Sequence, residues 1–126
     1  MSVPTDRKYT KTHEWHLADG NLVTIGITQF AADALTDITF VELPEVGTAV
    51  TAGQPFGEIE SVKATSDMVT GVSGTVQEIN SRLADEPELI NDDPFGAGWV
   101  VKIAATDIGE LDGLLDPASY EVEIAG

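Results

Sequence analysis

Lys63 has the residue type and the position for group-transfer chemistry on a side-chain amine. Lys63 and Arg82 are the only lysine or arginine residues between positions 12 and 101. Gly53 lies ten residues before Lys63 and Gly74 eleven residues after it, so the pattern predicts a hairpin with Lys63 at its tip. A lysine amine can be acylated, whereas an arginine guanidinium cannot at neutral pH. Exposed turn lysines are common, so spacing alone leaves an ordinary solvated lysine as the alternative.

Other side chains with catalytic or metal-binding potential form no recognisable site in the sequence. His13 and His16 are three residues apart in a segment predicted to be extended, and the chain has no third histidine, so we predict no metal site. The serines around Lys63 have no neighbouring histidine in sequence, which leaves no support for a serine hydrolase. These serines are Ser61, Ser66 and Ser73.

An acidic run in the second half of the chain lacks the glycine and the final glutamate of a calcium-binding loop. We predict that it is a solvated or docking surface. Its members are Asp85, Glu86, Glu88, Asp92 and Asp93.

The charge balance excludes several classes of partner. The 126-residue chain has 22 Asp and Glu against 6 Lys and Arg, a formal net charge of −16. Such a chain repels nucleic-acid phosphates and anionic lipid headgroups, so neither nucleic acid nor a membrane is an expected partner. Mutually repelling carboxylates are screened best in concentrated salt, which favours a halophilic prokaryotic host. Docking on basic partners is the alternative reason for so acidic a surface.

Cysteine is absent, so disulfides, thiolate nucleophiles and iron–sulfur clusters are excluded, and any redox chemistry must come from an added group. The sequence has no long apolar span and no signal-peptide pattern, so we expect a cytoplasmic protein. It also has no linker-like segment. We therefore expect residues 1–126 to form a single domain.

Short strands are predicted to position these side chains, because β-branched and aromatic residues recur between glycine and proline turns. They cover residues 22–27, 38–43, 49–51, 56–61, 68–70, 74–79 and 99–104. A capping threonine and helical spacing of apolar residues predict a short helix over residues 28–35. Helical turns are predicted over residues 80–90, 107–115 and 117–124. The pattern is typical of a mainly β protein, a small barrel or sandwich.

Five segments, in the same order, resemble the H proteins of the glycine cleavage system. They are YTKTHEW at residues 9–15, VTIGIT at 23–28, FVELP at 40–44, ESVKA at 60–64 and LINDDPFGAGW at 89–99. Several motifs in one order are more specific than any single motif. The resemblance implies a barrel-sandwich hybrid of two small antiparallel sheets, as in lipoyl domains, with short peripheral helices and a helical C-terminal tail.

The resemblance implies a non-catalytic carrier with lipoate in amide linkage on Lys63. The other residues of the lipoylation motif are Glu60, Ser61, Val62 and Ala64. The implied partners are a glycine decarboxylase that loads the aminomethyl group of glycine on the arm, an aminomethyltransferase that removes it, and dihydrolipoamide dehydrogenase, which reoxidises the arm. A lipoate-attaching enzyme is a further implied partner. Biotinyl carriers normally have methionine on both sides of the modified lysine, so Val62 and Ala64 favour lipoate.

The resemblance also implies a cleft for the loaded arm, lined by Glu14 with Thr12 and Asp67 as neighbours. Many relatives have serine where this chain has Thr12, and solvated surface carboxylates are the alternative for Glu14 and Asp67. Trp15 and Trp99 are predicted to be core or cleft-wall aromatics. Two other functions remain open, a donor of lipoyl or octanoyl groups in lipoate assembly and an unmodified interaction module.

Overall fold

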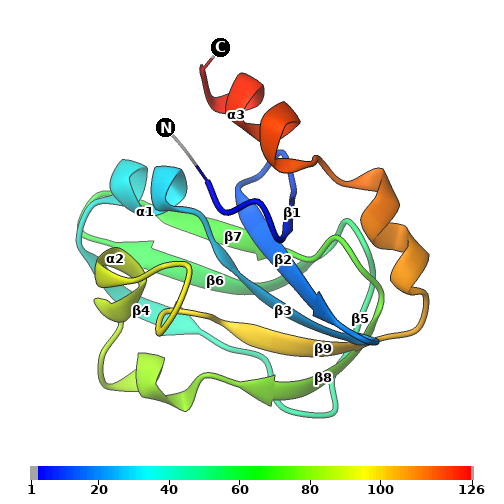
Figure 1. Cartoon of the computed structure of the whole chain (residues 1–126). Coiled ribbons are helices and arrows are strands. Elements are labelled where there is room, and N and C mark those ends of the chain that lie inside the picture. Colours follow the sequence, from blue (N-terminus) through cyan, green and yellow to red (C-terminus); the bar gives the residue numbers. More distant parts are fainter. Residues whose placement is uncertain (1–2, 126) are drawn as a thin grey trace.

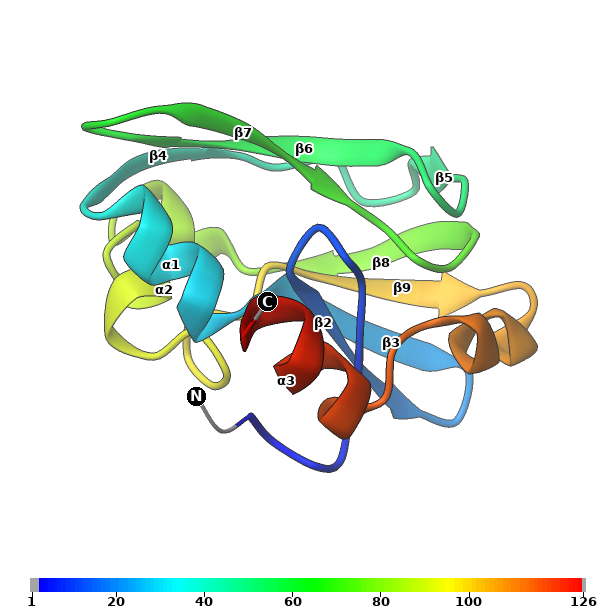
Figure 2. The ribbon, with the colours of Figure 1, turned by 90° about the horizontal axis from the view of Figure 1, so that it is seen from above.

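The computed structural model describes residues 3–125, which form two antiparallel sheets stacked as two layers (Figure 1 and Figure 2). The larger sheet has six strands in the order β1-β2-β3-β9-β8-β5. Their bounds are β1 Lys8–Tyr9, β2 Glu14–Asp19, β3 Leu22–Ile27, β5 Ala49–Val50, β8 Gly74–Ile79 and β9 Val101–Ala105. This sheet carries the N-terminal strands, and with them the segment around Glu14.

The smaller sheet has three strands in the order β4-β6-β7 and forms the second layer. Their bounds are β4 Ile38–Glu42, β6 Pro55–Ser61 and β7 Thr65–Val69. β6 and β7 are joined by a hairpin, and β7 is an edge strand of this sheet. The tip of that hairpin contains Lys63.

Short helices cover the ends of the two layers. They are α1 Gln29–Leu35, α2 Leu89–Asp92, α3 Pro117–Ala125 and the 3₁₀ helices η1 Ser81–Ala84 and η2 Ile108–Gly113. The side chain of Thr28 accepts a hydrogen bond from the Ala31 N–H and so caps the start of α1. α1 and α2 lie side by side at one end, while α3 lies over the N-terminal strands (Figure 1 and Figure 2).

Two hydrophobic clusters stabilise this arrangement. The main cluster fills the space between the sheets and includes Ile25, Ile59 and Ile103. The second lies under α3, and its buried residues are Val3, Tyr9, Trp15 and Tyr120. A Cβ atom at Gly26 would lie 2.6 Å from the Trp15 ring, so the indole can pack against β3 only with glycine at this position. The second cluster attaches the C-terminal helix to the strands that lead into Glu14.

The predicted architecture is confirmed: two antiparallel sheets, peripheral helices and a C-terminal helix. Most predicted boundaries differ from the observed ones by one or two residues, and three differences are larger. β7 begins at Thr65, three residues before the predicted strand, because the polar residues Thr65 to Asp67 pair with β6 while remaining exposed. The predicted helical stretch over residues 80–90 is instead two separate short helices, η1 and α2. β1 and β2 pair as strands where the sequence indicated only an extended segment.

Within residues 3–125, no helix has the length and apolar character to cross a membrane.

Candidate functional site

The β6–β7 hairpin presents Lys63 in a tight turn. Glu60 and Thr65 are its last paired residues, and the Ser61 N–H donates to the Ala64 carbonyl at 2.8 Å. The Ser61 hydroxyl oxygen accepts hydrogen bonds from the backbone N–H groups of Lys63 (3.1 Å) and Ala64 (3.0 Å). Ser61 therefore fixes the backbone on both sides of the lysine, and the motif residue has a definite structural role.

The Lys63 side chain is exposed and unpaired. No Asp or Glu oxygen of residues 3–125 lies within 4.0 Å of its amine, although three other basic residues of this part of the chain form ion pairs. Val62, next to it, is 70% exposed. A second protein can thus surround the tip and reach the amine.

The hairpin tip is also anchored to the end of α1. The Val62 N–H donates to the Asp37 carbonyl at 3.1 Å, just beyond the helix. α1 therefore runs from Thr28, beside the segment that holds Glu14, toward the lysine. β7 covers the same span in the opposite chain direction, from Thr65 at the tip to Val69 at Glu14, which is four residue steps or about 13 Å of strand.

Glu14 lies at the far end of this span, and it is buried rather than solvated. Its residue exposure is only 1%. Its Oε1 atom accepts hydrogen bonds from the hydroxyls of Thr10 and Thr12, and its Oε2 atom accepts one from the Val69 N–H at 3.1 Å. The carboxylate therefore joins the β1–β2 turn to the end of β7.

Burial raises the pKa of Glu14, because the charged form loses hydration, while the hydrogen bonds from Thr10, Thr12 and Val69 oppose that rise. A buried carboxylate of this kind gains strongly from a cationic partner, since an ammonium restores the favourable environment that water would give. Thr12, one of the two hydroxyl donors, is exposed, so the Glu14 group lies next to the surface on that side.

Of the three predicted cleft residues, the structure brings Thr12 and Glu14 together but leaves Asp67 apart. Asp67 is exposed on β7 opposite Glu58, and no hydrogen bond in residues 3–125 joins its side chain to the Glu14 group. Sequence reasoning missed Thr10, which is the second hydroxyl on Glu14. Residues 11–13 form a turn where the sequence predicted an extended segment, and this turn brings Thr10 beside Thr12 and Glu14. The hydrogen bond from the Val69 N–H could not be predicted from residue types, because its donor is a backbone group.

The two predicted aromatics and the two histidines have separate roles. Trp15 is buried and its Nε1–H donates to the Pro94 carbonyl at 2.9 Å, whereas Trp99 is half-buried under the Lys102 amine. His13 bonds to Tyr120 through Nδ1, while His16 Nε2 accepts the Gly71 N–H at 2.9 Å. The histidines therefore face different elements.

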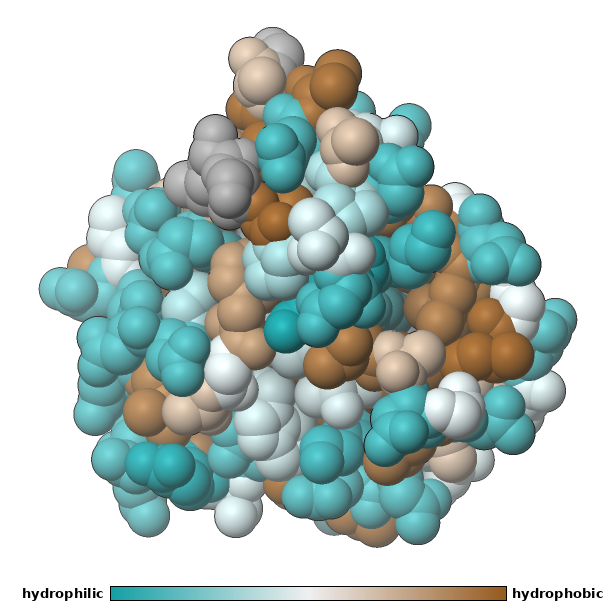
Figure 3. All heavy atoms as spheres, in the orientation of Figure 1, coloured by the Kyte–Doolittle hydropathy of each residue, from teal (hydrophilic) through white to brown (hydrophobic). Residues whose placement is uncertain are grey.

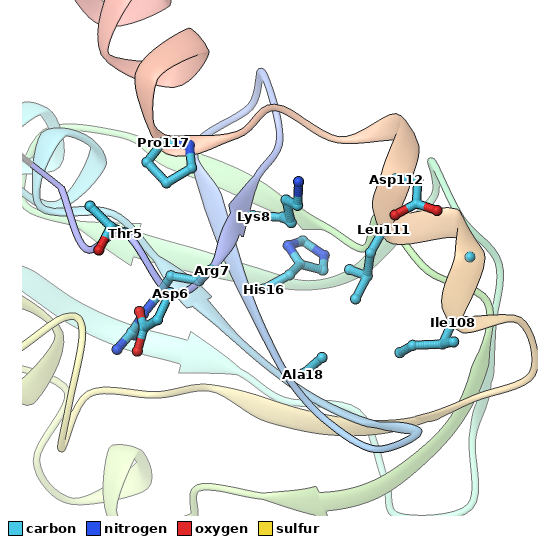
Figure 4. A pocket seen from close by; sticks show the side chains of 11 residues that line it. Thr5, Asp6, Arg7, Lys8, His16, Ala18, Ile108, Leu111, Asp112 and Pro117 are labelled. Carbon is cyan, nitrogen blue, oxygen red and sulfur yellow. The ribbon is translucent and has the colours of Figure 1, made fainter.

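A hollow of about 480 Å³ lies between β1–β2 and η2 (Figure 4). Brown apolar atoms gather over η2 and the neighbouring strand ends in the space-filling view (Figure 3). The lining includes Lys8, His16 and Leu111 but neither Lys63 nor Glu14. It is separate from the hairpin and the Glu14 group.

Comparison with known proteins gives one consistent family. The profile of the family described as "Glycine cleavage H-protein" matches residues 7–125. A glycine cleavage system H protein of Beutenbergia cavernae is 52% identical over 126 residues, covering 100% of this chain and 99% of that protein. A probable H protein of Haloarcula marismortui is 51% identical over 124 residues, covering 98% of each chain.

Structural comparison agrees. The crystal structure of a glycine cleavage system H protein from Mycobacterium marinum superposes with a TM-score of 0.89 at 42% identity, covering 98% of this chain and 100% of that chain. The predicted lipoyl-domain-like barrel-sandwich fold is thereby confirmed. The order of the motifs, the exposed lysine at the hairpin tip and these full-length matches together place this chain in the glycine cleavage H-protein family.

Proposed function

We propose that this chain is the lipoyl carrier of its glycine cleavage system and that Lys63 bears the lipoate in amide linkage. The observation that carries the proposal is the ESVKA motif on an exposed, unpaired hairpin tip whose backbone Ser61 fixes. Family membership supports the carrier role, and the exposed amine supports the position.

The residues at the tip suit this group. Amide formation needs an accessible amine and room around it, and both residues that flank Lys63 are exposed. Lipoate would supply the ring disulfide that the cysteine-free chain lacks, and with it the sulfur that takes up the aminomethyl group of glycine. The chain contributes presentation: a rigid turn, a flexible lysine stem and a surface that larger enzymes can approach.

The proposed partners follow from that role. A glycine decarboxylase, an aminomethyltransferase and dihydrolipoamide dehydrogenase would dock in turn at the tip, after a lipoate-attaching enzyme has modified Lys63. The chain itself would catalyse no step. Its acidic surface favours rapid encounters of defined orientation with complexes that remain short-lived.

Glu14 is the proposed protecting residue for the cargo. A carboxylate that accepts a hydrogen bond from an ammonium raises the pKa of that ammonium and so keeps the nitrogen protonated. The nitrogen lone pair is then unavailable to expel the sulfur from their shared carbon, so ammonia is retained. Thr12 would yield its place on Oε1 to the incoming N–H, and the exposed Asp67 would lie along the approach on β7.

Lys63→Arg tests the attachment site. It keeps the positive charge, and since Lys63 is exposed without an ion pair, the melting temperature should stay within about 1 °C of wild type, as is usual for surface changes. Intact-mass measurement of protein from its own host should show one lipoyl group on wild type and none on the variant. Glycine cleavage with the partner enzymes should be lost.

Lys11→Arg is the matched control, because Lys11 is also an exposed lysine and lies outside the ESVKA motif. It should keep both the modification and the activity. A lipoyl group on Lys11, biotin on Lys63, or near-normal activity of Lys63→Arg would overturn the proposal.

A further inference from the structure

The hydroxyl of Tyr120 joins three elements beside Glu14. Tyr120 is fully buried on α3, and its ring stacks on Tyr9 with the ring centres 4.7 Å apart. Its hydroxyl lies 2.7 Å from the Thr28 hydroxyl and 2.9 Å from His13 Nδ1. The C-terminal helix thus contacts both the start of α1 and the turn that leads into Glu14.

These hydrogen bonds form a chain with one consistent direction. The Thr28 hydroxyl oxygen accepts the Ala31 N–H at 3.3 Å as the cap of α1. It can then donate to the Tyr120 oxygen, which leaves the Tyr120 hydroxyl hydrogen free to donate to His13 Nδ1. Burial lowers the pKa of His13, with Glu123 opposing, so at neutral pH the imidazole is the neutral acceptor that this direction needs.

His13 needs such support because its backbone is unusual. Its φ angle is 75°, in the left-handed region that a non-glycine residue adopts at a cost. Its N–H donates to the Thr10 carbonyl at 3.2 Å, and its carbonyl accepts the Thr28 N–H at 3.0 Å. Tyr120 therefore fixes the side chain of the residue whose backbone closes the turn.

The same turn carries the hydroxyls that hold Glu14. Thr10 and Thr12 both donate to Oε1, and the Glu14 N–H donates to the Thr10 hydroxyl oxygen at 3.0 Å. The charge of Glu14 also raises the pKa of Tyr120, to which burial contributes more.

We propose that Tyr120 is a positioning residue for Glu14: through His13 and Thr28 it sets the turn that aims the carboxylate at the end of β7, where the loaded arm would be held. The inference rests on the proposed protecting role of Glu14. The C-terminal helix then has a part in retaining the cargo, although no hydrogen bond within residues 3–125 joins it to Lys63 or to the carboxylate.

Tyr9 provides a matched control within the same stack. Both tyrosines are buried to the same extent, but the Tyr9 hydroxyl donates to the Pro4 carbonyl at 2.6 Å, away from the Glu14 turn. Tyr120→Phe and Tyr9→Phe therefore each remove one buried hydroxyl and keep the ring. Only the first breaks the link to His13.

The first experiment uses the unlipoylated protein and measures hydrogen exchange of the Val69 amide, which donates to Glu14 Oε2. Loss of a hydrogen bond of ordinary strength predicts exchange about three- to tenfold faster in Tyr120→Phe. Tyr9→Phe should stay within about twofold of wild type. His13→Phe, which keeps an aromatic ring against Phe30 and removes the acceptor, should resemble Tyr120→Phe.

The second experiment measures ammonia release from aminomethyl-loaded protein without its transferase. Tyr120→Phe should release ammonia about three- to tenfold faster than wild type and Tyr9→Phe. In a Glu14→Gln background, Tyr120→Phe should add no further increase, because the two residues act through one carboxylate.

The inference is overturned if Tyr120→Phe behaves as Tyr9→Phe does in both experiments, or if its effect adds fully to that of Glu14→Gln. Failure of the proposed function has a different signature. In that case Glu14→Gln alone would leave ammonia release unchanged, while the Val69 exchange rates would still report whether Tyr120 positions the carboxylate.

Discussion

At the scale of residues, two side chains of β2 connect this strand to β7, with which it has no backbone pairing. Glu14 and His16 lie on the same face of β2, two residues apart, and each accepts a backbone N–H from the end of β7 or just beyond it. The acceptor-to-nitrogen distances are 3.1 Å to Val69 and 2.9 Å to Gly71. β2 and β7 belong to different sheets and form no backbone ladder, so these two hydrogen bonds join the layers. Glu14, the carboxylate proposed to retain ammonia on the loaded arm, therefore also helps to hold the two sheets together.

His16 makes folding stability sensitive to acid. Burial lowers its pKa to about 4, against an ordinary value of 6.5, and a contact with the Glu14 carbonyl opposes this. The folded state thus favours neutral imidazole, so the stabilisation is complete above pH 6.5 and is lost as the pH falls toward 4. The loss from this group amounts to about 3 kcal/mol of the free energy of unfolding.

His16→Gln isolates that effect, because an amide oxygen can still accept the Gly71 N–H but does not titrate. Denaturant unfolding of both proteins between pH 7 and pH 4 should show wild type losing more stability than the variant. The carboxylates are common to both, and Glu14, whose pKa is raised by burial, changes stability in the opposite sense. The variant also retains the charged side chains near the ring, which are Asp6, Arg7, Lys8 and Asp112. Parallel curves would show that His16 is not the sensitive group.

At the scale of elements, local patterns predicted the hairpin but not what surrounds it. Glycine spacing located the tip at Lys63, since turns and strand lengths are local properties of the chain. The Tyr120 contacts with His13 and Thr28 join residues 107 and 92 positions apart, which no periodicity encodes. The start of β7 was missed because its first residues are polar and form a strand only through pairing. Motif resemblance supplied Glu14 and Thr12, while the burial of Glu14 needed the fold.

The turn around Lys63 should depend on Ser61. Ser61→Ala removes the acceptor for the Lys63 and Ala64 N–H groups in an exposed turn, which should cost about 0.5–1 kcal/mol. The tip then samples more conformations, so its initial rate of lipoylation by the attaching enzyme should fall about two- to fivefold. Amide exchange at Lys63 and Ala64 should accelerate in parallel.

Ser66→Ala is the matched control. Ser66 is exposed on β7, and its hydroxyl makes only a 3.4 Å contact with the Asp67 carbonyl. Its lipoylation rate should equal that of wild type. Equal rates for Ser61→Ala and Ser66→Ala would mean that the attaching enzyme itself shapes the tip and the preset turn has no importance.

At the scale of the whole molecule, the fold distributes a large negative charge over two layers with few ion pairs. Residues 3–125 contain three, formed by Arg7 with Asp6, Arg82 with Glu86 and Lys102 with Glu78. Across the three-stranded sheet, Glu42, Glu58 and Asp67 lie in register as direct cross-strand neighbours. Like charges in that relation destabilise a sheet, so the layer that carries the lysine should be the part most sensitive to screening.

Salt should therefore stabilise this protein, and Glu58 should account for a measurable part of that stabilisation. Between 0.1 M and 1 M salt the Debye length falls from about 10 Å to about 3 Å, which suppresses repulsion between exposed carboxylates. With a net charge of −16, the melting temperature should rise from dilute buffer to molar KCl. Glu58→Gln removes the central charge of the row and should raise the melting temperature in dilute buffer by about 2 °C, an advantage that disappears in molar KCl. Glu86→Gln removes an equal charge but loses the Arg82 partner, so it should give no such gain. A flat or falling melting curve against salt would refute both the repulsion argument and the halophilic host that the composition favours, and it would leave the carrier role of Lys63 unaffected.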